Sequence, residues 1–303
     1  MPFKRHPTFR PAPSEESKLW RYMGLPKYLS LLQDRSLFFR SLEMVAGSDP
    51  FEGTLPASRF VHRKWASIDD VPEHIRDKFL RPDESDPEFK LQRLKDIAEL
   101  RIRQAYAYRR SYFINCWHLS EFESAAMWDI YSRRNEAIAI KSSESRFQAA
   151  FANAHQDIMG GKIVYGEYAD EDFEMDDSNA FTPVLHKRNS FSYEQEYRLV
   201  YWDTSVTSKQ IRSQNGFFRW NGHVVPDIKD IGIMNVGRSE EEIESLPVQP
   251  GYSISCDINA LVEAIYISPL AKDWLLNVVK DVSLKYGLEA PVDKSPLMSK
   301  PLR

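Results

Sequence analysis

Residues 115–143 read NCWHLSEFESAAMWDIYSRRNEAIAIKSS, and this stretch decides how the neighbouring sequence is interpreted. It continues a strand-like run that begins at Ser111, and its middle has the apolar spacing of a short helix. The apolar residues 137–140 then predict a buried strand. His118 lies beside Trp117, and Trp128 follows in the helical part. A histidine, large aromatic residues and small polar residues in so short a span indicate a functional site.

The remaining sequence predicts further strands and helices on both sides of this segment. Residues 19–23 have the composition of a strand, residues 26–35 the spacing of an amphipathic helix and residues 36–45 the composition of a second strand. Residues 160–161 predict a turn before a strand, and residues 197–202 predict a late strand. Residues 271–287 predict a terminal helix with Trp274 facing inward and a glycine at its end.

This order of elements favours an α+β fold. We expect a single mixed domain over residues 18–303, with a central, mostly antiparallel sheet flanked by helices. Helical spacing at about residues 67–111 predicts a helical insertion. The polar, proline-rich residues 1–17 are expected to form a flexible, extended N-terminal arm.

Composition limits the class of protein. The chain has 303 residues with 42% hydrophobic residues, which is enough for a proper core, and its net charge of −4 provides no overall positive field for nucleic acid. Cys116 and Cys256 are too few for a disulfide framework, and we expect both to be buried free thiols. The sequence shows neither a signal-peptide core nor an apolar run that could span a bilayer, so we expect a cytoplasmic protein without a membrane partner.

The motif GSDPFEG at residues 47–53 is a fixed turn that contains two carboxylates. Asp49 and Glu52 are three residues apart. Turn chemistry, in which Asp49 caps a short helical turn, is the favoured interpretation. The alternative is a pair of carboxylates at the mouth of a pocket.

A second acidic motif precedes the strand at residues 197–202. Glu194 and Glu196 would face the same side of an extended chain, where burial can raise the pKa of one carboxyl into a catalytically useful range. Salt bridging is the favoured interpretation of these two residues alone. The candidate cationic partners are Lys187, Arg188 and Arg198.

Two charged runs are interpreted as solvated surfaces. The helix expected before residue 111 carries basic residues that could meet nucleic-acid phosphates, but acidic residues are mixed with them. The basic residues are Lys90, Arg93, Lys95, Arg101, Arg103, Arg109 and Arg110. The acidic run at residues 170–177 lacks the spacing of a calcium loop, so we expect an exposed loop and no metal site.

Several segments together resemble the bacterial domain-of-unknown-function family 2971. The resemblance covers about residues 18–275, and the chain departs from it at Ser48, where the family usually carries Asn, and at Ala137, where many members carry Gly. The segments that carry it are LWRYMGLPKYLSLL, SDPFEG, CWHLSEFESAAMWDIYS with the following AIAIKSS, SYEQEYRLVYW and DINALVEAIYISPLAKDW.

The layout of that family is similar to ADP-ribosyltransferase folds, including the DNA-modifying DarT-type toxins. The resemblance implies an NAD-contacting residue on the first strand, a polar serine strand in mid-chain and a glutamate at the head of a later strand. The matching positions are Arg21 or Tyr22, then Ser142 and Ser143, and then Glu196 with Glu194.

Under this resemblance, each candidate residue has an expected role. Glu196 would stabilise positive charge on the ribose, and Tyr22, Trp128 or Tyr131 would stack on nicotinamide. His118 would bind a ribose hydroxyl or act as an acid or base. Core packing is the favoured interpretation of Trp128 and Tyr131 taken alone, and a hydrogen-bonded structural histidine is an equal alternative for His118.

The resulting hypothesis is an ADP-ribosyltransferase-like enzyme that uses NAD as a substrate, without a metal, and modifies a nucleic-acid or protein acceptor. Such an enzyme would serve as a toxin or phage-defence effector. The alternative hypothesis is a non-catalytic module of the same fold that recognises a nucleotide, a nucleic acid or a protein, with the basic helix contributing.

Overall fold

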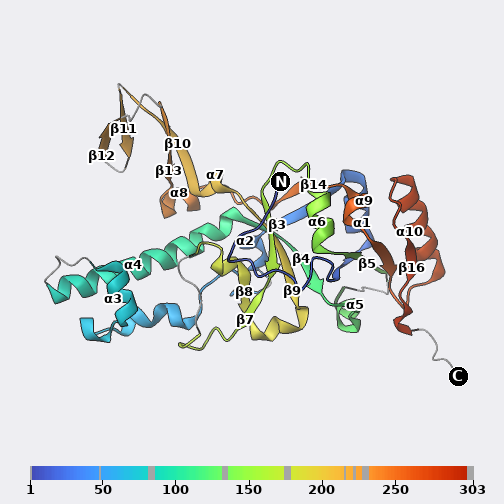
Figure 1. The fold of residues 1–303 in the computed structure, drawn as a ribbon, viewed down its shortest axis with the longest axis horizontal. Helices are drawn as coiled ribbons and strands as arrows, with labels where there is room; N and C mark the ends of the chain where they lie inside the picture. The colour runs from blue at the N-terminus through green and yellow to red at the C-terminus, as the bar shows by residue number, and fades with distance from the viewer. Residues whose placement is uncertain are drawn as a thin grey trace.

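A ten-stranded mixed sheet runs through the middle of the protein, with helices on both of its faces (Figure 1). The computed structural model describes residues 2–47, 49–80, 86–131, 136–173, 179–214, 216–220, 223–226 and 232–298. The strands of the sheet are β1 (Phe3–Lys4), β2 (Leu19–Gly24), β3 (Ser36–Ser41), β4 (Tyr112–Leu119), β5 (Ala137–Ser142), β6 (Ile158–Lys162), β9 (Glu196–Trp202), β14 (Gly251–Ser255), β15 (Ala264–Ile267) and β16 (Val292–Lys294).

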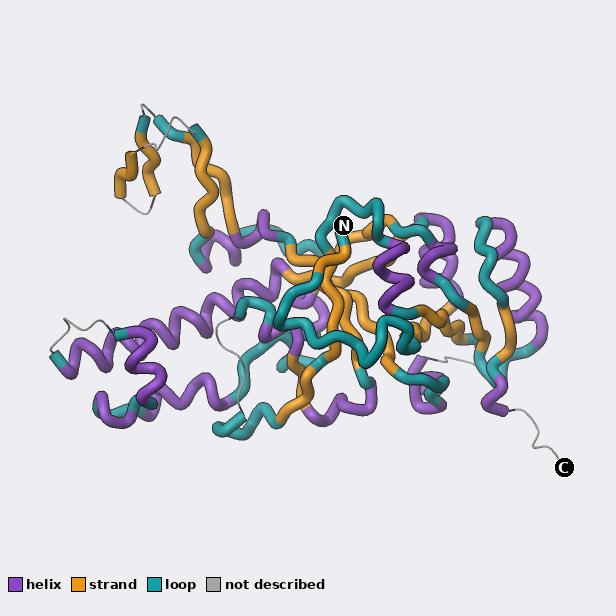
Figure 2. Tube along the Cα trace, in the orientation of Figure 1, coloured by secondary structure: helices purple, strands orange, loops and turns teal. Residues whose placement is uncertain are grey.

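The strands follow the order β1-β6-β9-β4-β2-β5-β15-β16, and β3 joins β4 and β14 beside this path. Only the pairs β1/β6 and β15/β16 of this sheet are parallel among the strands described. Figure 2 shows the sheet between its helical layers. The predicted α+β fold with a mostly antiparallel sheet is therefore confirmed.

The apolar side chains of the strands alternate between the two faces of the sheet, so the protein has one core cluster on each face. Phe113 and Trp117 of β4 pack with the larger core, whereas Tyr112 and Ile114 belong to a second cluster on the opposite face. Successive strand residues point to opposite faces, so one strand serves both clusters. Helices α1 (Leu25–Asp34), α6 (Glu144–Ala150), α9 (Ile258–Leu261) and α10 (Asp273–Lys285) cover the larger core, and the 3-10 helix η5 (Thr182–Leu185) covers the second cluster.

The sheet splits beside the middle of β4. Strand β2 pairs with β4 only at Leu19↔Leu119 and Trp20↔His118. Strand β3 pairs with β4 only at Arg40↔Ile114 and Ser41↔Phe113. Residues 115–117 thus have no strand partner on this edge among the described pairs, and α1 bridges the two strands that diverge there.

Local sequence explains how β2 and β3 separate. Helix α1 begins directly after β2, with Pro26 in its first turn, and it ends at Arg35 in a left-handed conformation with φ 44°. Its buried residues are Tyr28, Leu31 and Leu32, as the amphipathic pattern predicts. The short helix α2 (Leu42–Val45) then follows β3, so the predicted strand over residues 36–45 ends earlier than expected.

The helical insertion starts earlier than predicted, at η1 (Ala57–Lys64). It continues through η2 (Ile68–Asp70), α3 (Glu73–Phe79), α4 (Pro87–Tyr108) and η3 (Arg109–Ser111). Trp65, Val71 and Leu94 form a small core of its own. Figure 1 shows α4 running outward from the sheet with α3 beside it.

Residues 206–250, for which no regular elements were predicted, contain two pairs of strands that protrude from the body. Strand β10 (Ser208–Arg212) pairs with β13 (Ile233–Gly237), and β11 (Phe217–Trp220) pairs with β12 (His223–Pro226) farther out (Figure 1). The short helices α7 (Thr204–Thr207) and α8 (Glu240–Glu244) lie at the base of this arm. Strands β7 (Val164–Gly166) and β8 (His186–Arg188) form a separate parallel pair, and the 3-10 helices η6 (Asn189–Glu194) and η8 (Pro296–Met298) complete the described elements.

The N-terminal segment packs against the sheet, which corrects the expectation of a flexible arm. Phe3 and Lys4 pair with β6, and Arg10 bridges to Lys162. Phe9 is 6% exposed because it packs into the second core cluster. The apolar residues between the prolines therefore anchor the segment.

Two further expectations are wrong in detail. Trp274 of α10, expected to face inward, is 48% exposed. Gly160 and Gly161, expected in a turn, lie within β6. A Cβ atom at Gly160 would clash with the Tyr197 hydroxyl, and one at Gly161 would be in tight contact with Phe9. No helix among the described residues is long and apolar enough to cross a bilayer.

Candidate functional site

A cavity of about 670 Å³ opens where the sheet splits. Its floor consists of side chains from β2, β3, β4 and β9, and its walls come from α1, helix α5 (Ala125–Tyr131) and the segments 49–52 and 187–194. The cavity gathers ten of the thirteen predicted site residues. They are Arg21, Tyr22, Asp49, Glu52, His118, Tyr131, Lys187, Glu194, Glu196 and Arg198.

Ser142 and Ser143 do not line this cavity, which corrects their predicted role. The Ser142 hydroxyl donates to the carbonyl of Leu261 at 2.6 Å, and the residue is fully buried. Ser143 caps α6, because its side chain accepts from the backbone N–H of Arg146. Both serines hold secondary structure together.

Trp128 lies behind the cavity wall and not in it. It is 2% exposed and packs edge-on against Tyr22, with ring centroids 5.0 Å apart. Its indole N–H donates to Glu123. Core packing, the favoured interpretation of Trp128 taken alone, is therefore what the structure shows, whereas Tyr131 is 44% exposed and reaches the cavity.

A fully buried arginine organises the acidic end of the cavity. Arg198 donates to both oxygens of Glu196, at 2.6 and 3.0 Å, and to Glu52 Oε1 at 2.8 Å. It also donates to the carbonyl of Val184 at 2.6 Å. Burial opposes ionisation of Glu196, but Arg198 and Lys187 outweigh it and lower the pKa of Glu196 to about 2. Glu196 is thus ionised at neutral pH.

Lys187 connects the three carboxylates of this cluster. Its ammonium lies 2.6 Å from Glu194, 3.3 Å from Glu196 and 3.5 Å from Glu52. Glu194 differs from the other two because 26% of its side chain is exposed and Lys187 is the one cation bonded to it among the described residues. Burial raises the pKa of Glu194, and Lys187 offsets only part of this effect.

Asp49 caps the turn, as the favoured interpretation predicts, and it also pairs with an arginine. Its Oδ1 accepts from the backbone N–H of Phe51, as a turn-capping residue does, and also pairs with Arg188 at 2.6 Å. The Arg188 guanidinium stacks on Phe51 at 4.4 Å from the ring centroid. The turn thereby holds Glu52 beside Arg198.

His118 presents one ring nitrogen to the cavity. Its Nδ1 lies 2.6 Å from the carbonyl oxygen of Glu194, which can only accept a hydrogen bond, so Nδ1 carries the proton. Burial lowers the pKa of His118, and the bond to Glu194 offsets this in part. The neutral ring therefore keeps a lone pair on Nε2.

Arg21 fills the split in the sheet. Its guanidinium donates to Asn115 Oδ1 at 2.7 Å and to the carbonyl of Cys116 at 2.8 Å. The Asn115 amide donates across the split to the carbonyl of Phe38 at 3.0 Å. These bonds replace the strand ladder that β4 lacks here.

Arg21, Lys27 and Arg40 form a cation cluster on the β2 and β3 side of the cavity, across β4 from Arg198 of β9. Burial lowers the pKa of Lys27, and the positive charges of Arg21 and Arg40 act in the same direction. No carboxylate among the described residues pairs with any of them. Sequence reasoning missed Lys27 and Arg40, which gave no signal beyond single basic residues on a helix and a strand.

Cys116 opens onto the cavity, whereas Cys256 is buried, so the expectation of two buried thiols is half wrong. The surrounding protein displaces water from the Cys116 thiol, and the negative charge of Glu196 acts in the same direction, so the pKa of this thiol is raised. The thiol also donates to Glu196.

We predict that native Cys116 reacts slowly with iodoacetamide despite its exposure. The thiolate is the nucleophile, and a raised pKa lowers its fraction at pH 7.5, so labelling should be at least about tenfold slower than in the urea-unfolded chain. Mass spectrometry of the labelled peptides measures both rates. Equal rates in the native and unfolded protein would contradict the raised pKa.

Three of the basic residues in and after α4 have partners within the protein. Arg103 of α4 pairs with Glu240 at 3.0 Å, and Arg109 of η3 lies 3.4 Å from Glu43. Arg110, also of η3, donates to backbone carbonyls in and after α8. These contacts supply internal partners to a run that the sequence predicts to be a solvated surface.

The described residues contain no group of three or more His, Cys, Asp or Glu side chains that could hold a metal ion. Of the acidic run, Glu174, Asp176 and Asp177 lie outside the described residues. No family model matches the chain, and neither a curated protein nor a solved structure matches it.

Proposed function

We propose that the cavity binds NAD in its oxidised form and that the protein is an ADP-ribosyltransferase-like enzyme. The observation that carries this proposal is the separation of charge within one cavity. Arg21, Lys27 and Arg40 lie at one end. At the other end, the carboxylates of Glu52, Glu194 and Glu196 exceed the cations of Lys187 and Arg198 by one negative charge.

Oxidised NAD has the complementary charges. Its pyrophosphate is anionic and suits the cation cluster, and its nicotinamide ring is cationic and suits the acidic end. Tyr22 and Tyr131, whose rings are nearly parallel at 6.4 Å between centroids, offer aromatic faces to a cationic ring. A volume of about 670 Å³ lies within the usual range for ligand cavities.

The proposed reaction breaks the nicotinamide–ribose bond, and the bonding electron pair leaves with nicotinamide. An acceptor oxygen or nitrogen then bonds to the ribose carbon, and its proton passes to Glu194. Glu196, held ionised by Arg198, stabilises the positive charge that builds on the ribose. His118 Nε2 accepts a hydrogen bond from a ribose hydroxyl.

The acceptor class follows from the resemblance to family 2971 and to DarT-type toxins. It is a nucleic acid or a protein, and the biological role is that of a toxin or phage-defence effector in the cytoplasm. The protein is incubated with labelled NAD in a cell extract, and the label is then measured on DNA, RNA and protein. The class of molecule that carries the label is the acceptor.

Calorimetric titration tests the proposed binding. Lys27→Ala should weaken NAD binding about 10–100-fold, because one charge-assisted contact to the pyrophosphate is lost. Lys280→Ala, an exposed lysine on α10, is the matched control and should bind as the wild type does. The reduced form, whose ring is neutral, should bind several-fold more weakly than the oxidised form.

Absence of NAD binding to the wild-type protein would exclude the proposal, and equal affinity in Lys27→Ala would exclude the role of the cation cluster. Nicotinamide release, followed by chromatography, separates turnover from binding.

A non-catalytic nucleotide-recognition module is the second candidate. It is favoured by the bonding of Glu196, whose two oxygens are fully engaged by Arg198 and Lys187. Such a module would bind NAD or a related nucleotide without releasing nicotinamide, so the same chromatographic assay decides between the two candidates.

A further inference from the structure

The floor of the large cavity crosses four neighbouring strands of the sheet. Strand β9 pairs with β4, β4 with β3, and β3 with β14. Paired residues share one face of a sheet, as do residues two apart on a strand, so the floor is continuous. Strands lie about 4.8 Å apart, which makes the floor roughly 14 Å wide and gives room for both halves of a dinucleotide. The pairs that form the floor are Cys116↔Arg198, Ile114↔Arg40 and Phe38↔Ser253.

An exposed aromatic ring lies at the β14 side of this floor. Phe38 lines the cavity and is 48% exposed. Its ring lies over Gly251 of β14, where a Cβ atom would come within 2.3 Å of the ring. Exposed aromatic rings of this kind stack on nucleic-acid bases. With the nicotinamide ring of the proposed ligand at the acidic end, the adenine at the opposite end of the dinucleotide reaches Phe38.

Arg40 is the cation beside this ring. It lies on the same face of β3, two residues or roughly 6.6 Å along the strand from Phe38. Its Nη2 donates to the carbonyl of Met44 at 3.1 Å, a neutral partner that leaves the positive charge uncompensated. A phosphate on the 2′ carbon of a ribose lies beside the base that the same ribose carries. An adenine on Phe38 therefore brings such a phosphate to Arg40, whose planar guanidinium suits phosphate oxygens.

The charge on this side of the cavity exceeds what NAD requires. The cation cluster supplies three positive charges that no described carboxylate neutralises, whereas a pyrophosphate carries two negative charges. A site that selects NAD against its 2′-phosphorylated form holds the ribose hydroxyl with a carboxylate. Here each of the four described carboxylates that line the cavity is bonded to Lys187, Arg188 or Arg198.

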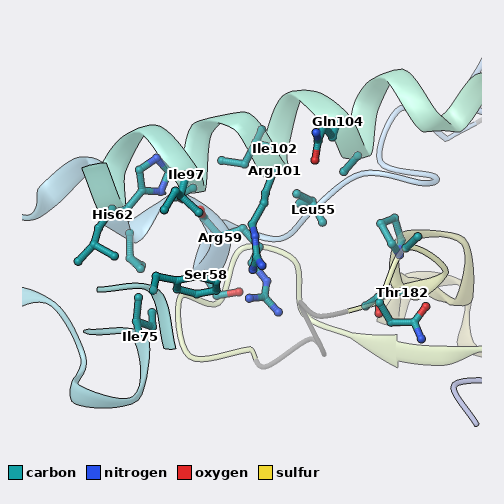
Figure 3. Close-up of a pocket in the computed structure, with 18 of the residues that line it drawn as sticks. Leu55, Ser58, Arg59, His62, Ile75, Ile97, Arg101, Ile102, Gln104 and Thr182 are labelled. Carbon is teal, nitrogen blue, oxygen red and sulfur yellow. Dashed lines mark hydrogen bonds between the residues drawn. The ribbon is translucent and has the colours of Figure 1, made fainter. Parts of the chain in front are cut away.

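A smaller cavity elsewhere in the protein does not suit this ligand. It measures about 320 Å³, lies beneath α4 and is lined mainly by apolar side chains (Figure 3). Arg59 and Arg101 line it, but both already interact with other residues, and Arg101 stacks on Phe79 at 4.6 Å from the ring centroid. The dinucleotide is therefore assigned to the larger cavity.

We propose that the large cavity prefers oxidised NADP, the 2′-phosphorylated form of NAD, with its adenine on Phe38 and its 2′-phosphate at Arg40. The pyrophosphate is then left to Lys27, which makes no hydrogen bond or ion pair with any described residue. This inference rests on the proposed function, because it concerns the same ligand site. The group transferred to the acceptor is ADP-ribose that carries the additional phosphate.

Calorimetric titration of the full-length protein with oxidised NAD and oxidised NADP, at one ionic strength, tests the preference. NADP should bind at least about tenfold more tightly, because its extra phosphate forms charge-assisted hydrogen bonds with Arg40. Arg40→Met should weaken NADP binding about tenfold more than NAD binding, whereas Lys27→Ala should weaken both alike. Arg212→Met removes an exposed arginine of β10 outside the cavity and is the matched control, with both affinities unchanged.

Phe38→Leu tests the position of the adenine. This variant should weaken both dinucleotides about fivefold or more and leave nicotinamide mononucleotide, which has no adenine, within about twofold. Phe122→Leu changes a phenylalanine that is 80% exposed and does not line the cavity, so it should bind all three ligands as the wild type does.

Three results would contradict the inference. Equal affinity of the wild type for NAD and NADP, or equal weakening of both in folded Arg40→Met, would overturn the preference for the 2′-phosphate and leave NAD binding intact. Undiminished dinucleotide binding in Phe38→Leu would overturn the position of the adenine. Absence of binding of either dinucleotide to the wild type would instead overturn the proposed function, and this inference with it.

Discussion

Arg198→Met is expected to lower the free energy of unfolding by about 3–5 kcal/mol. Arg198 is 0% exposed, and it neutralises Glu196 through two hydrogen bonds and Glu52 through a third. Methionine retains much of the side-chain volume but leaves two buried carboxylates with Lys187 as their nearest cation. Urea unfolding followed by tryptophan fluorescence measures the change.

Two further variants make this expectation specific. Arg5→Met removes an arginine from an exposed ion pair with Glu15 and should change stability by less than about 1 kcal/mol. Arg198→Met combined with Glu196→Leu removes one of the stranded charges, so it should recover part of the loss. Stability of Arg198→Met within 1 kcal/mol of the wild type would show that water or relaxation satisfies the carboxylates.

The strands around the site were predictable because each carries its own short-range signal. The strand-like run that begins at Ser111, the apolar residues 137–140 and the late strand predicted over residues 197–202 correspond to β4, β5 and β9. Glu194 and Glu196 do meet, but the predicted extended-chain parity is wrong, because Glu194 ends η6 and Gln195 is left-handed with φ 41° before β9 begins at Glu196. Lys187 is what bridges the two carboxylates. The turn at residues 47–53 could be recognised locally, but its contact with Arg198, 146 positions away, could not.

What the sequence could not reveal is the geometry between the strands. Lys27 and Arg40 became neighbours of Arg21 because β2 and β3 diverge from β4, and no local pattern encodes that split. The prediction that Ser142 and Ser143 belong to the site was wrong because it also depended on how the strands pair. Ser142 ends β5 opposite Leu19, and Ser143 follows it, so both residues lie away from the split. The side of the sheet that a polar residue faces depends on tertiary pairing.

The N-terminal segment and Trp274 show a second limit. Composition describes how polar a segment is, but burial of a few apolar residues decides whether it docks. Phe9 and Ala12 are buried, and Phe3 and Lys4 pair with β6, so residues 2–17 lie against the sheet. Trp274 has the spacing of a core residue and is exposed because it lies one position before the buried stripe that begins at Leu275.

Glu194→Gln is expected to reduce nicotinamide release about 10²–10⁴-fold, the usual contribution of a general base, while NAD binding persists. Glu194 is the most open carboxylate of the cluster, with 26% of its side chain exposed, and burial raises its pKa toward the working pH. Activity should rise as the pH increases through this pKa, because only the ionised carboxylate can accept a proton. Glu263→Gln, which removes a carboxylate bound to Lys141 outside the cavity, is the control.

A parallel Glu196→Gln variant separates chemistry from folding. Glu196 has a pKa lowered to about 2, so it stays ionised across the assay range and cannot produce the pH dependence. Its substitution should lower both the melting temperature and turnover, because Arg198 loses its main partner. Glu194→Gln should lower turnover alone. Undiminished nicotinamide release in Glu194→Gln, together with an unchanged pH profile, would assign the proton transfer to His118, which lines the cavity and carries a lone pair on Nε2.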